Sequence, residues 1–261
     1  MSTPLVRSYE ESAVVIAGGS SGVGLASALG FIDAGVTRIA LLSRSPERGL
    51  AARDTVKARN PEAQVEFIAV DVDYPDQVQR AVEQAKQSLG GLDVLVSSIA
   101  AKYRPELLHT IDPELFSQII GKQALPPMYL TRSVLPIMRE QGGGSIINIA
   151  SDAAKVPTPG ESVLGAAMAA IVMFSRTAAI EAKRDGIRVN TLTPSLIAGT
   201  PTADRVLSDG FSKNLFEKAS KMAHLGVAEA EDLARMVVFL GGPGSARMTG
   251  QVISINGGIS T

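Results

Sequence analysis

The chain has 261 residues, of which 45% are hydrophobic and 20% charged, and its formal net charge is -1. Such a composition is ordinary for a globular protein, and the length suits one large α/β unit, so we expect residues 1–261 to form a single domain. The near-neutral charge excludes a basic surface for nucleic acid. A small molecule is therefore the expected partner.

The sequence also argues against several other classes of protein. It contains no cysteine, which excludes a disulfide framework and thiolate chemistry. The first residues, MSTPLVRSYEES, lack the apolar region of a secretory signal, and the longest uncharged apolar run, VLGAAMAAIVMF, is too short to span a bilayer. No group of His, Asp and Glu has metal-ligand spacing. We expect a cytoplasmic protein without membrane contact or metal.

Seven short runs rich in β-branched residues are typical of strands buried on both faces of a parallel sheet. They are AVVIA from Ala13, RIALL from Arg38, VEFIAV from Val65, LDVLVS from Leu92, SIINIA from Ser145, IRVNTL from Ile187 and VISI from Val252. Helical patterns between them include residues 24–34, 75–89, 113–138, 163–183 and 229–240. This alternation predicts βαβ crossovers and a three-layer, doubly wound Rossmann fold with a single, mostly parallel seven-stranded sheet.

Residues 199–224 interrupt this alternation. Gly, Pro and Thr are followed there by a weakly amphipathic helical pattern. In an open α/β sheet such a segment can lie over the carboxyl ends of the strands, where ligands bind. We expect a substrate lid, whose side chains weakly favour an apolar or mixed small molecule.

A glycine-rich turn, AGGSSGVG at residues 17–24, joins the first predicted strand to the first helix. Its glycines would let the backbone turn tightly and approach a pyrophosphate, to which the helix N-terminus offers N–H groups. A tight strand-to-helix turn needs glycine in any case, but the position after the first strand favours a dinucleotide. The expected cofactor-binding residues here are Gly18, Ser20, Ser21, Gly22, Val23 and Gly24.

The end of the second predicted strand bears on the choice of dinucleotide. An NAD-preferring site would place Asp or Glu there, but this strand ends LLSRS. Ser43 and Arg44 offer a hydroxyl and a guanidinium, which suit a 2′-phosphate. Arg44 could also be a solvated loop charge. We predict NADP(H) rather than NAD(H).

Over nearly its whole length the chain resembles the short-chain dehydrogenase/reductase family. AGGSSGVG is similar to that family's TGxxxGxG turn, and LDVLVSSIA stands where the family has a strand ending in NNAG. GGGSIINIAS resembles the strand that delivers the catalytic serine, here Ser151, and MTGQVISINGG resembles the closing TGQxxxxDGG, with Asn256 for the usual Asp.

The resemblance implies further roles. AVDV resembles the third-strand end that lies by the adenine, which implies Asp71 and Val72 as cofactor contacts. IRVNTLTPSLI is similar to the segment that flanks the nicotinamide, which implies Pro194 and Ile197. A homodimer or homotetramer is also implied, because in the family the helix corresponding to SVLGAAMAAI packs against its counterpart in a neighbouring subunit.

The catalytic segment departs from the family. Members carry YxxxK thirteen residues after the serine, and that register reads Leu164 and Met168 here. Leu164 has no proton to give, and Met168 has no charge with which to lower the pKa of a phenol. Because a positioned general acid contributes about 10²–10⁴-fold to rate, we expect a divergent member in which the usual proton chemistry is removed or relocated.

Three residues are our candidates for catalysis: Ser151, Tyr103 and Gln123. Tyr103 lies beside Lys102 and could restore a phenol and an ammonium, although adjacent side chains often point apart and a solvated loop is the alternative. Gln123 stands where the family has an Asn that holds a relay water. The other acid–base side chains considered are Lys122, Asp152, Lys155, His109 and His224.

Three functions remain open at this stage. One is an NADP(H)-dependent oxidoreductase acting on a small carbonyl, enone or imine with a non-standard proton donor. Another is a non-redox lyase or dehydratase on the same fold, and the third is a catalytically silent nucleotide-binding subunit. The retention of Ser151 favours an enzyme, and we predict the oxidoreductase.

Overall fold

Seven parallel strands form the central sheet of the computed structural model, which describes residues 6–100, 102–208 and 210–260. Their order is β3–β2–β1–β4–β5–β6–β9, and every neighbouring pair is parallel. The strands are β1 (Ala13–Ala17), β2 (Arg38–Ser43), β3 (Gln64–Ala69), β4 (Val94–Ser97), β5 (Gly144–Ile149), β6 (Ile187–Pro194) and β9 (Val252–Ile255). The predicted doubly wound α/β fold is confirmed.

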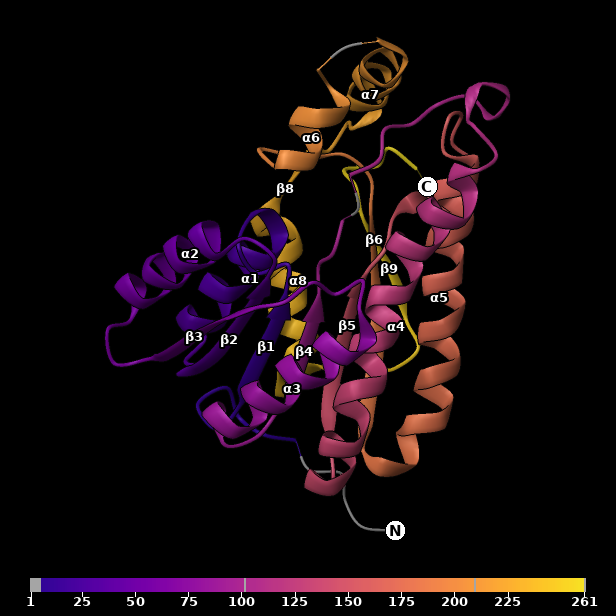
Figure 1. The fold of residues 1–261 in the computed structure, drawn as a ribbon. Helices are drawn as coiled ribbons and strands as arrows, with labels where there is room; N and C mark the ends of the chain where they lie inside the picture. Colours follow the sequence, from indigo (N-terminus) through magenta and orange to yellow (C-terminus); the bar gives the residue numbers. More distant parts are fainter. Residues whose placement is uncertain (1–5, 101, 209, 261) are drawn as a thin grey trace.

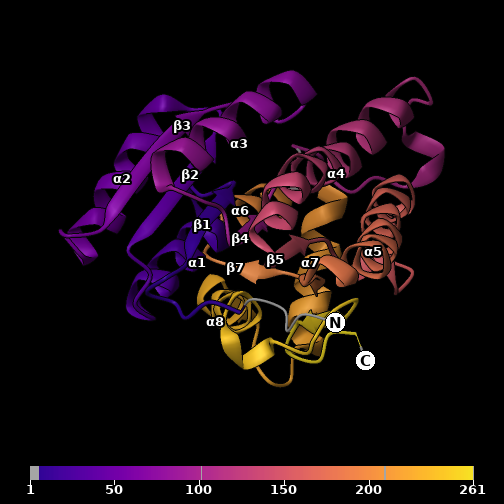
Figure 2. The ribbon, with the colours of Figure 1, turned by 90° about the horizontal axis from the view of Figure 1, so that it is seen from below.

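Helices cover both faces of this sheet, as Figures 1 and 2 show. One face carries α3 (Pro75–Leu89), α4 (Leu115–Gln141) and α5 (Ser162–Ala182), and the other carries α1 (Gly22–Asp33), α2 (Pro46–Arg59) and α8 (Ala230–Gly241). Strand β1 shows why both layers form. Ala13, Val15 and Ala17 pack with the first set of helices, and Val14 and Ile16 with the second, because successive side chains of a strand point to opposite faces.

Helix α3 illustrates how local sequence sets the boundaries of these elements. Pro75 occupies the first turn, where its missing N–H costs no hydrogen bond. Gly90 ends the helix at φ 74°, a left-handed conformation that favours glycine. Between them, buried apolar residues recur at helical spacing and face the sheet. They are Val78, Ala81, Val82, Ala85 and Leu89.

The residues expected to form a lid lie beyond the carboxyl ends of the strands, as Figure 1 shows. They include α6 (Pro201–Val206) and α7 (Gly210–Met222). The chain leaves the body at β7 (Ile197–Ala198) and returns at β8 (Ala228–Glu229), and these two strands pair in parallel at the base of the segment. This short pair is separate from the predicted single sheet.

Helix α5 is the most apolar of the long helices. Within the described part of the chain, Ser162–Asp185 is the one helical stretch with the length and hydropathy of a possible membrane span. However, 44% of its most apolar window is buried inside the protein, and its inner residues Ala178, Ala179 and Ala182 pack in the core with α3 and α4. A core helix of a folded domain accounts for that pattern.

Candidate functional site

Two adjoining cavities lie along the carboxyl ends of the strands. The first, which we call the glycine-rich groove, has a volume of about 730 Å³ and is bounded by the turn after β1, the ends of β2 and β3, and α6. The second, which we call the inner cavity, has about 370 Å³ and is bounded by the loop after β5, the start of α5, and α7. Both are lined by Tyr103 and by Ser98, Ile99 and Ala100 after β4, so the two spaces meet there.

The turn after β1 can be made only with glycine. Gly18 has φ 81°, and a Cβ on it would lie 2.1 Å from the carbonyl oxygen of Ser98. A Cβ on Gly24 would lie 2.2 Å from the carbonyl oxygen of Gly18, so α1 packs directly on the turn. Gly18, Ser20, Ser21, Gly22 and Val23 line the groove, whereas Gly24 lies behind it. This is a cradle that a side chain would fill, and it fits a pyrophosphate.

The end of β2 supplies positive charge to the same groove. Ser43, Arg44 and Arg48 line it, and the buried Ser43 hydroxyl has no hydrogen-bond partner among the described residues. No acidic residue of β2 or of the turn that follows lines the groove. Arg48 was not among the cofactor-binding residues predicted from the sequence. Its position four residues after Arg44 could have indicated that it faces the same groove. Two guanidinium groups and an orphaned hydroxyl suit a phosphate.

Of the two residues predicted to contact the adenine, Asp71 and Val72, the structure places only Val72 among the residues that line the groove. Val72 lines the groove, as does the neighbouring Asp73. Asp71 is not among the lining residues, and its carboxylate accepts the backbone N–H of Asp73 at 3.2 Å. Asp71 therefore shapes the turn after β3, and a direct contact with the adenine stays a prediction.

Ser151 lies at the inner cavity, together with Pro194 and Ile197 from β6 and β7. Its Oγ accepts the backbone N–H of Ala153 at 3.2 Å, which leaves the hydroxyl proton available to a ligand. Helix α5 approaches this loop closely, because a Cβ on Gly165 would lie 2.8 Å from the carbonyl oxygen of Ala153. The small residue at 165 thus packs within the chain.

Leu164 and Met168 line the same cavity as Ser151. Both belong to an apolar cluster with Ala124, Ala150 and Ile171, so this wall is hydrocarbon. Gln123, the counterpart of the family's Asn, also lines the cavity and is 3% exposed. Its Nε2 donates to the carbonyl oxygen of Ile99 at 3.4 Å, which orients the amide along the loop after β4.

Tyr103 faces both cavities, and its environment keeps its hydroxyl protonated. The buried hydroxyl makes no geometric hydrogen bond among the described residues. Burial raises its pKa, and the charges of Glu106 and Glu161 raise it further, against a smaller opposite effect of the Glu106 backbone N–H. In the family an ammonium lowers the pKa of the catalytic phenol, whereas Lys102 here is exposed. Tyr103 is thus suited to donate a hydrogen bond.

Asp152 is a structural hub beside Ser151. Its carboxylate accepts hydrogen bonds from Ser254 at 3.0 Å, Ser260 at 2.6 Å and the Asn256 amide, and Lys155 lies 3.8 Å away. These contacts fasten the loop after β5 to the C-terminal segment. They also explain Asn256, since an aspartate there would face a second buried carboxylate.

Glu161 was missed by sequence reasoning and is the notable acid of the inner cavity. It lines that cavity and is 9% exposed. Burial raises its pKa to about 7, against a smaller lowering by a hydrogen bond from the Thr158 side chain. It precedes Leu164 and Met168 by three and seven residues, and this helix-like spacing was the signal available in the sequence.

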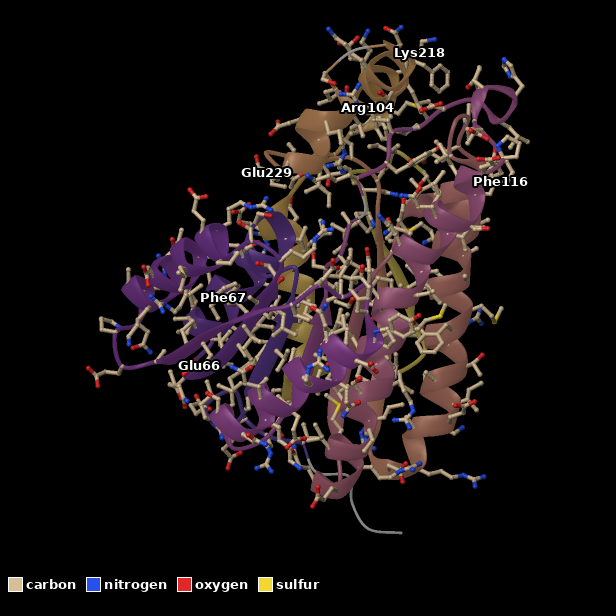
Figure 3. All side chains as sticks on the ribbon, in the orientation of Figure 1. Glu66, Phe67, Arg104, Phe116, Lys218 and Glu229 are labelled. Carbon is tan, nitrogen blue, oxygen red and sulfur yellow. The ribbon has the colours of Figure 1, made fainter. Side chains whose placement is uncertain are left out.

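The remaining candidates lie elsewhere. Lys122 lines the glycine-rich groove. His109 and His224 are both exposed, and neither lines either cavity. Among the residues that the structure describes, no cluster of His, Asp and Glu could hold a metal ion. Arg104 donates to Ser208 at 2.9 Å and so links the loop after β4 to the segment between α6 and α7; Figure 3 shows Arg104 and Lys218 in this upper region.

Comparison with known proteins identifies the class. Residues 17–260 match the family model described as enoyl-(acyl carrier protein) reductase. The chain is 32% identical over 248 residues to the 3-oxoacyl-[acyl-carrier-protein] reductase FabG of Chlamydia pneumoniae, across 95% of this chain and 96% of that protein. The fold and these matches define an oxidoreductase of the Rossmann type. The chain belongs to the short-chain dehydrogenase/reductase family.

Solved structures agree with this assignment. One similar structure is the L-sorbose reductase of Gluconobacter frateurii complexed with NADPH and L-sorbose, at 33% identity and a TM-score of 0.86, covering 98% of both chains. Another is an NADPH-bound short chain oxidoreductase from Pseudomonas aeruginosa PAO1, described as containing an atypical catalytic center. It is 26% identical, with a TM-score of 0.88 and coverage of 97% of this chain and 98% of that one.

Proposed function

We propose that this protein is an NADP(H)-dependent reductase of a small carbonyl compound, with a proton donor other than the family's tyrosine. The observation that carries this proposal is the continuity of the two cavities. A groove shaped for a dinucleotide opens, at Tyr103, onto a cavity that holds Ser151. A cofactor and a substrate bound in the two spaces would therefore meet near these two hydroxyls.

The preference for NADP(H) over NAD(H) is supported by the end of β2. The orphaned Ser43 hydroxyl and the guanidinium groups of Arg44 and Arg48 would hold the 2′-phosphate. The two NADPH-bound relatives described above are consistent with this choice. The glycine-rich turn and the N-terminus of α1 would hold the pyrophosphate.

A bound NADPH would supply the hydride for the carbonyl carbon, and the oxidised cofactor would be NADP⁺. Ser151 and Tyr103 would each donate a hydrogen bond to the substrate oxygen, because both have a hydroxyl proton that no described residue accepts. Gln123, held against Ile99, would position this oxygen or a water beside it. Leu164 and Met168 would exclude water from the reacting centre.

The substrate class follows from the inner cavity. Its walls are mostly apolar, and the polar side chains on them include Ser151 and, beside the cofactor groove, Tyr103. This favours a small molecule with one polar end, and an enone or imine would fit as well as a ketone. A non-redox lyase or a silent subunit is less well supported, because neither needs a dinucleotide groove that opens at Tyr103 onto a cavity holding Ser151.

The outer face of α5 supports the proposed homodimer or homotetramer. Ala166 and Ala169 are exposed on it, and Met173 and Ile180 are 61% and 66% exposed. Small residues on an apolar helix allow close approach of a second copy. Light scattering should report a dimer or tetramer, and Met173→Glu with Ile180→Glu should give monomers. A wild-type monomer would contradict this.

The proposed reaction is tested by binding and turnover. NADPH fluorescence should titrate with the protein, and NADPH should be oxidised with at least one member of a panel of 3-oxoacyl thioesters, ketoses, enones and cyclic imines. If NADPH did not bind at millimolar concentration, the proposal that NADP(H) is the cofactor would be wrong. Binding without turnover on the whole panel would favour the silent subunit.

A further inference from the structure

We propose that Glu161 is the proton donor of this site and that its carboxylic acid takes over the task of the family's tyrosine. The inference rests on the proposed function, because it assigns one step of that reaction to a named group. It differs from our expectation from the sequence, which looked for the donor at Ser151, Tyr103 and Gln123.

The position of Glu161 relative to the missing tyrosine is the first argument. Glu161 directly precedes α5, and Leu164, where the tyrosine would stand, follows one helical turn later. Both side chains line the inner cavity, together with Ser151 and Tyr103. Glu161 is therefore a carboxyl group at the N-cap of this helix, three residues before the position of the usual donor and lining the same cavity.

The backbone around Glu161 is held from several sides. Gly160 has φ 83°, and a Cβ on it would lie 2.5 Å from the ring of Phe211 in α7. Its carbonyl oxygen accepts the N–H of Glu106 at 2.9 Å, and the N–H of Glu161 donates to Thr158 at 3.1 Å. Three segments thus fix where this side chain enters the cavity, as a positioned acid requires.

The Glu161 carboxyl group has no positively charged ion-pair partner among the described residues. Among the described residues, no lysine or arginine lies within ion-pair distance of its carboxyl group, and the residue as a whole is 9% exposed. The other titratable side chains lining the cavity are Tyr103, Asp152, Arg205 and Lys218. Asp152 is already bound by Lys155, Ser254, Asn256 and Ser260.

The acidity of Glu161 suits the task better than that of Tyr103. Burial raises the pKa of Glu161 to about 7, so that near neutral pH a large fraction carries a proton. Burial raises the pKa of Tyr103 above its ordinary value of 10.0. An acid whose pKa is close to the working pH is the more effective proton donor.

The step balances within the proposed reaction. As the hydride forms the new C–H bond, the π electrons of the carbonyl group become a lone pair on oxygen. The O–H bond of the Glu161 carboxylic acid breaks, and its proton forms the O–H bond of the product alcohol. Glu161 is left as a carboxylate and takes a proton from water before the next turnover.

The kinetic test compares Glu161→Gln with wild type and with Glu161→Asp. As matched control, Glu181→Gln removes an exposed carboxyl at the far end of the same helix. Glu161→Gln should lower kcat about 10²–10⁴-fold with NADPH affinity unchanged, and Glu161→Asp should keep part of the rate. In wild type, kcat for reduction should fall as pH rises through about 7; this dependence should vanish in Glu161→Gln.

A second readout does not depend on turnover. Isotope-edited NMR of the glutamate carboxyl groups should show one resonance that titrates near pH 7, present in Glu181→Gln and lost in Glu161→Gln. If every glutamate of the wild-type protein titrates below pH 5, the inference is wrong. This outcome can be read from wild type alone, even if Glu161→Gln does not fold.

The outcomes separate the two proposals. Full activity and an unchanged pH profile in Glu161→Gln would overturn the role of Glu161 and leave the proposed function standing. A wild-type protein that oxidises no NADPH with the whole panel would overturn the proposed function and the role of Glu161 with it.

Discussion

The side-chain amide of Asn256 donates a hydrogen bond to the carboxylate of Asp152, and both side chains are buried, at 6% and 4% exposure. The pair joins the loop that carries Ser151 to the C-terminal segment after β9. The Asp152 carboxylate needs a neutral hydrogen-bond donor at position 256, and the asparagine amide supplies it.

Asn256→Asp should therefore lower the free energy of unfolding by about 1–3 kcal/mol, because it sets two carboxylates against each other and removes a donor. Chemical denaturation measures this. The double variant Asp152→Asn with Asn256→Asp should recover part of the loss, since the charge and the amide exchange places. Equal stability of Asn256→Asp and wild type would contradict this account of the pair.

Much of the fold could be predicted from the sequence because it depends on local patterns. The seven strands are short apolar runs, and α3 has its proline, its apolar stripe and its terminal glycine in order. The spacing of the glycines in residues 17–24 predicts the turn. These signals lie within about fifteen residues of one another and need no knowledge of the tertiary structure.

The catalytic part of the site was less predictable, for a physical reason. The importance of Glu161 comes from its burial between the loop at Glu106, α5 and α7, and no sequence window contains all three. The Asp152 hub joins residues more than 100 positions apart. Tyr103 and Lys102 both line the glycine-rich groove, and a phenol–ammonium pair between them stays a prediction.

The end of β2 makes a prediction about cofactor affinity. Arg44→Ala and Arg48→Ala should each raise the Kd for NADPH about tenfold, because each removes a charge-assisted contact to the 2′-phosphate. The Kd for NADH should change little. Arg53→Ala is the control, because Arg53 lies further along α2 and pairs with Asp54. Equal losses for NADPH and NADH would show that these side chains do not read the phosphate.

The hydroxyls of Ser151 in the inner cavity and of Tyr103 at the junction of the two cavities should both contribute to turnover. Ser151→Ala and Tyr103→Phe should each lower kcat about 10²-fold or more, as removal of a preorganised hydrogen-bond donor does. Tyr103→Phe should leave stability unchanged or slightly higher, because the buried hydroxyl has no hydrogen-bond partner among the described residues. Denaturation and steady-state kinetics test both. Unchanged kcat in both variants would remove these donors from the mechanism.

The raised pKa of Glu161 predicts a pH dependence of stability. In the folded state this group keeps its proton up to about pH 7, whereas unfolded it releases the proton near its ordinary value of 4.5. Between these values the folded state binds more protons, so the stability that this group contributes is present at low pH and is lost as pH rises to about 7. The loss is at most about 3 kcal/mol.

Denaturation at pH 5 and pH 8 measures this effect. Wild type and Glu181→Gln should lose stability between the two conditions, and Glu161→Gln should lose less. The same slope in all three proteins would place the pKa of Glu161 in the ordinary range.

We propose that this chain reduces a carbonyl group with NADPH although Leu164 and Met168 stand where the resemblance to the family places tyrosine and lysine. The most direct test of this proposal is the rate of NADPH oxidation by the purified wild-type protein with the substrate panel, against Ser151→Ala. Wild type should oxidise NADPH in a substrate-dependent manner, and the rate should fall about 10²-fold or more in Ser151→Ala. NADPH binding without oxidation above the uncatalysed rate, for every substrate, would contradict the proposal.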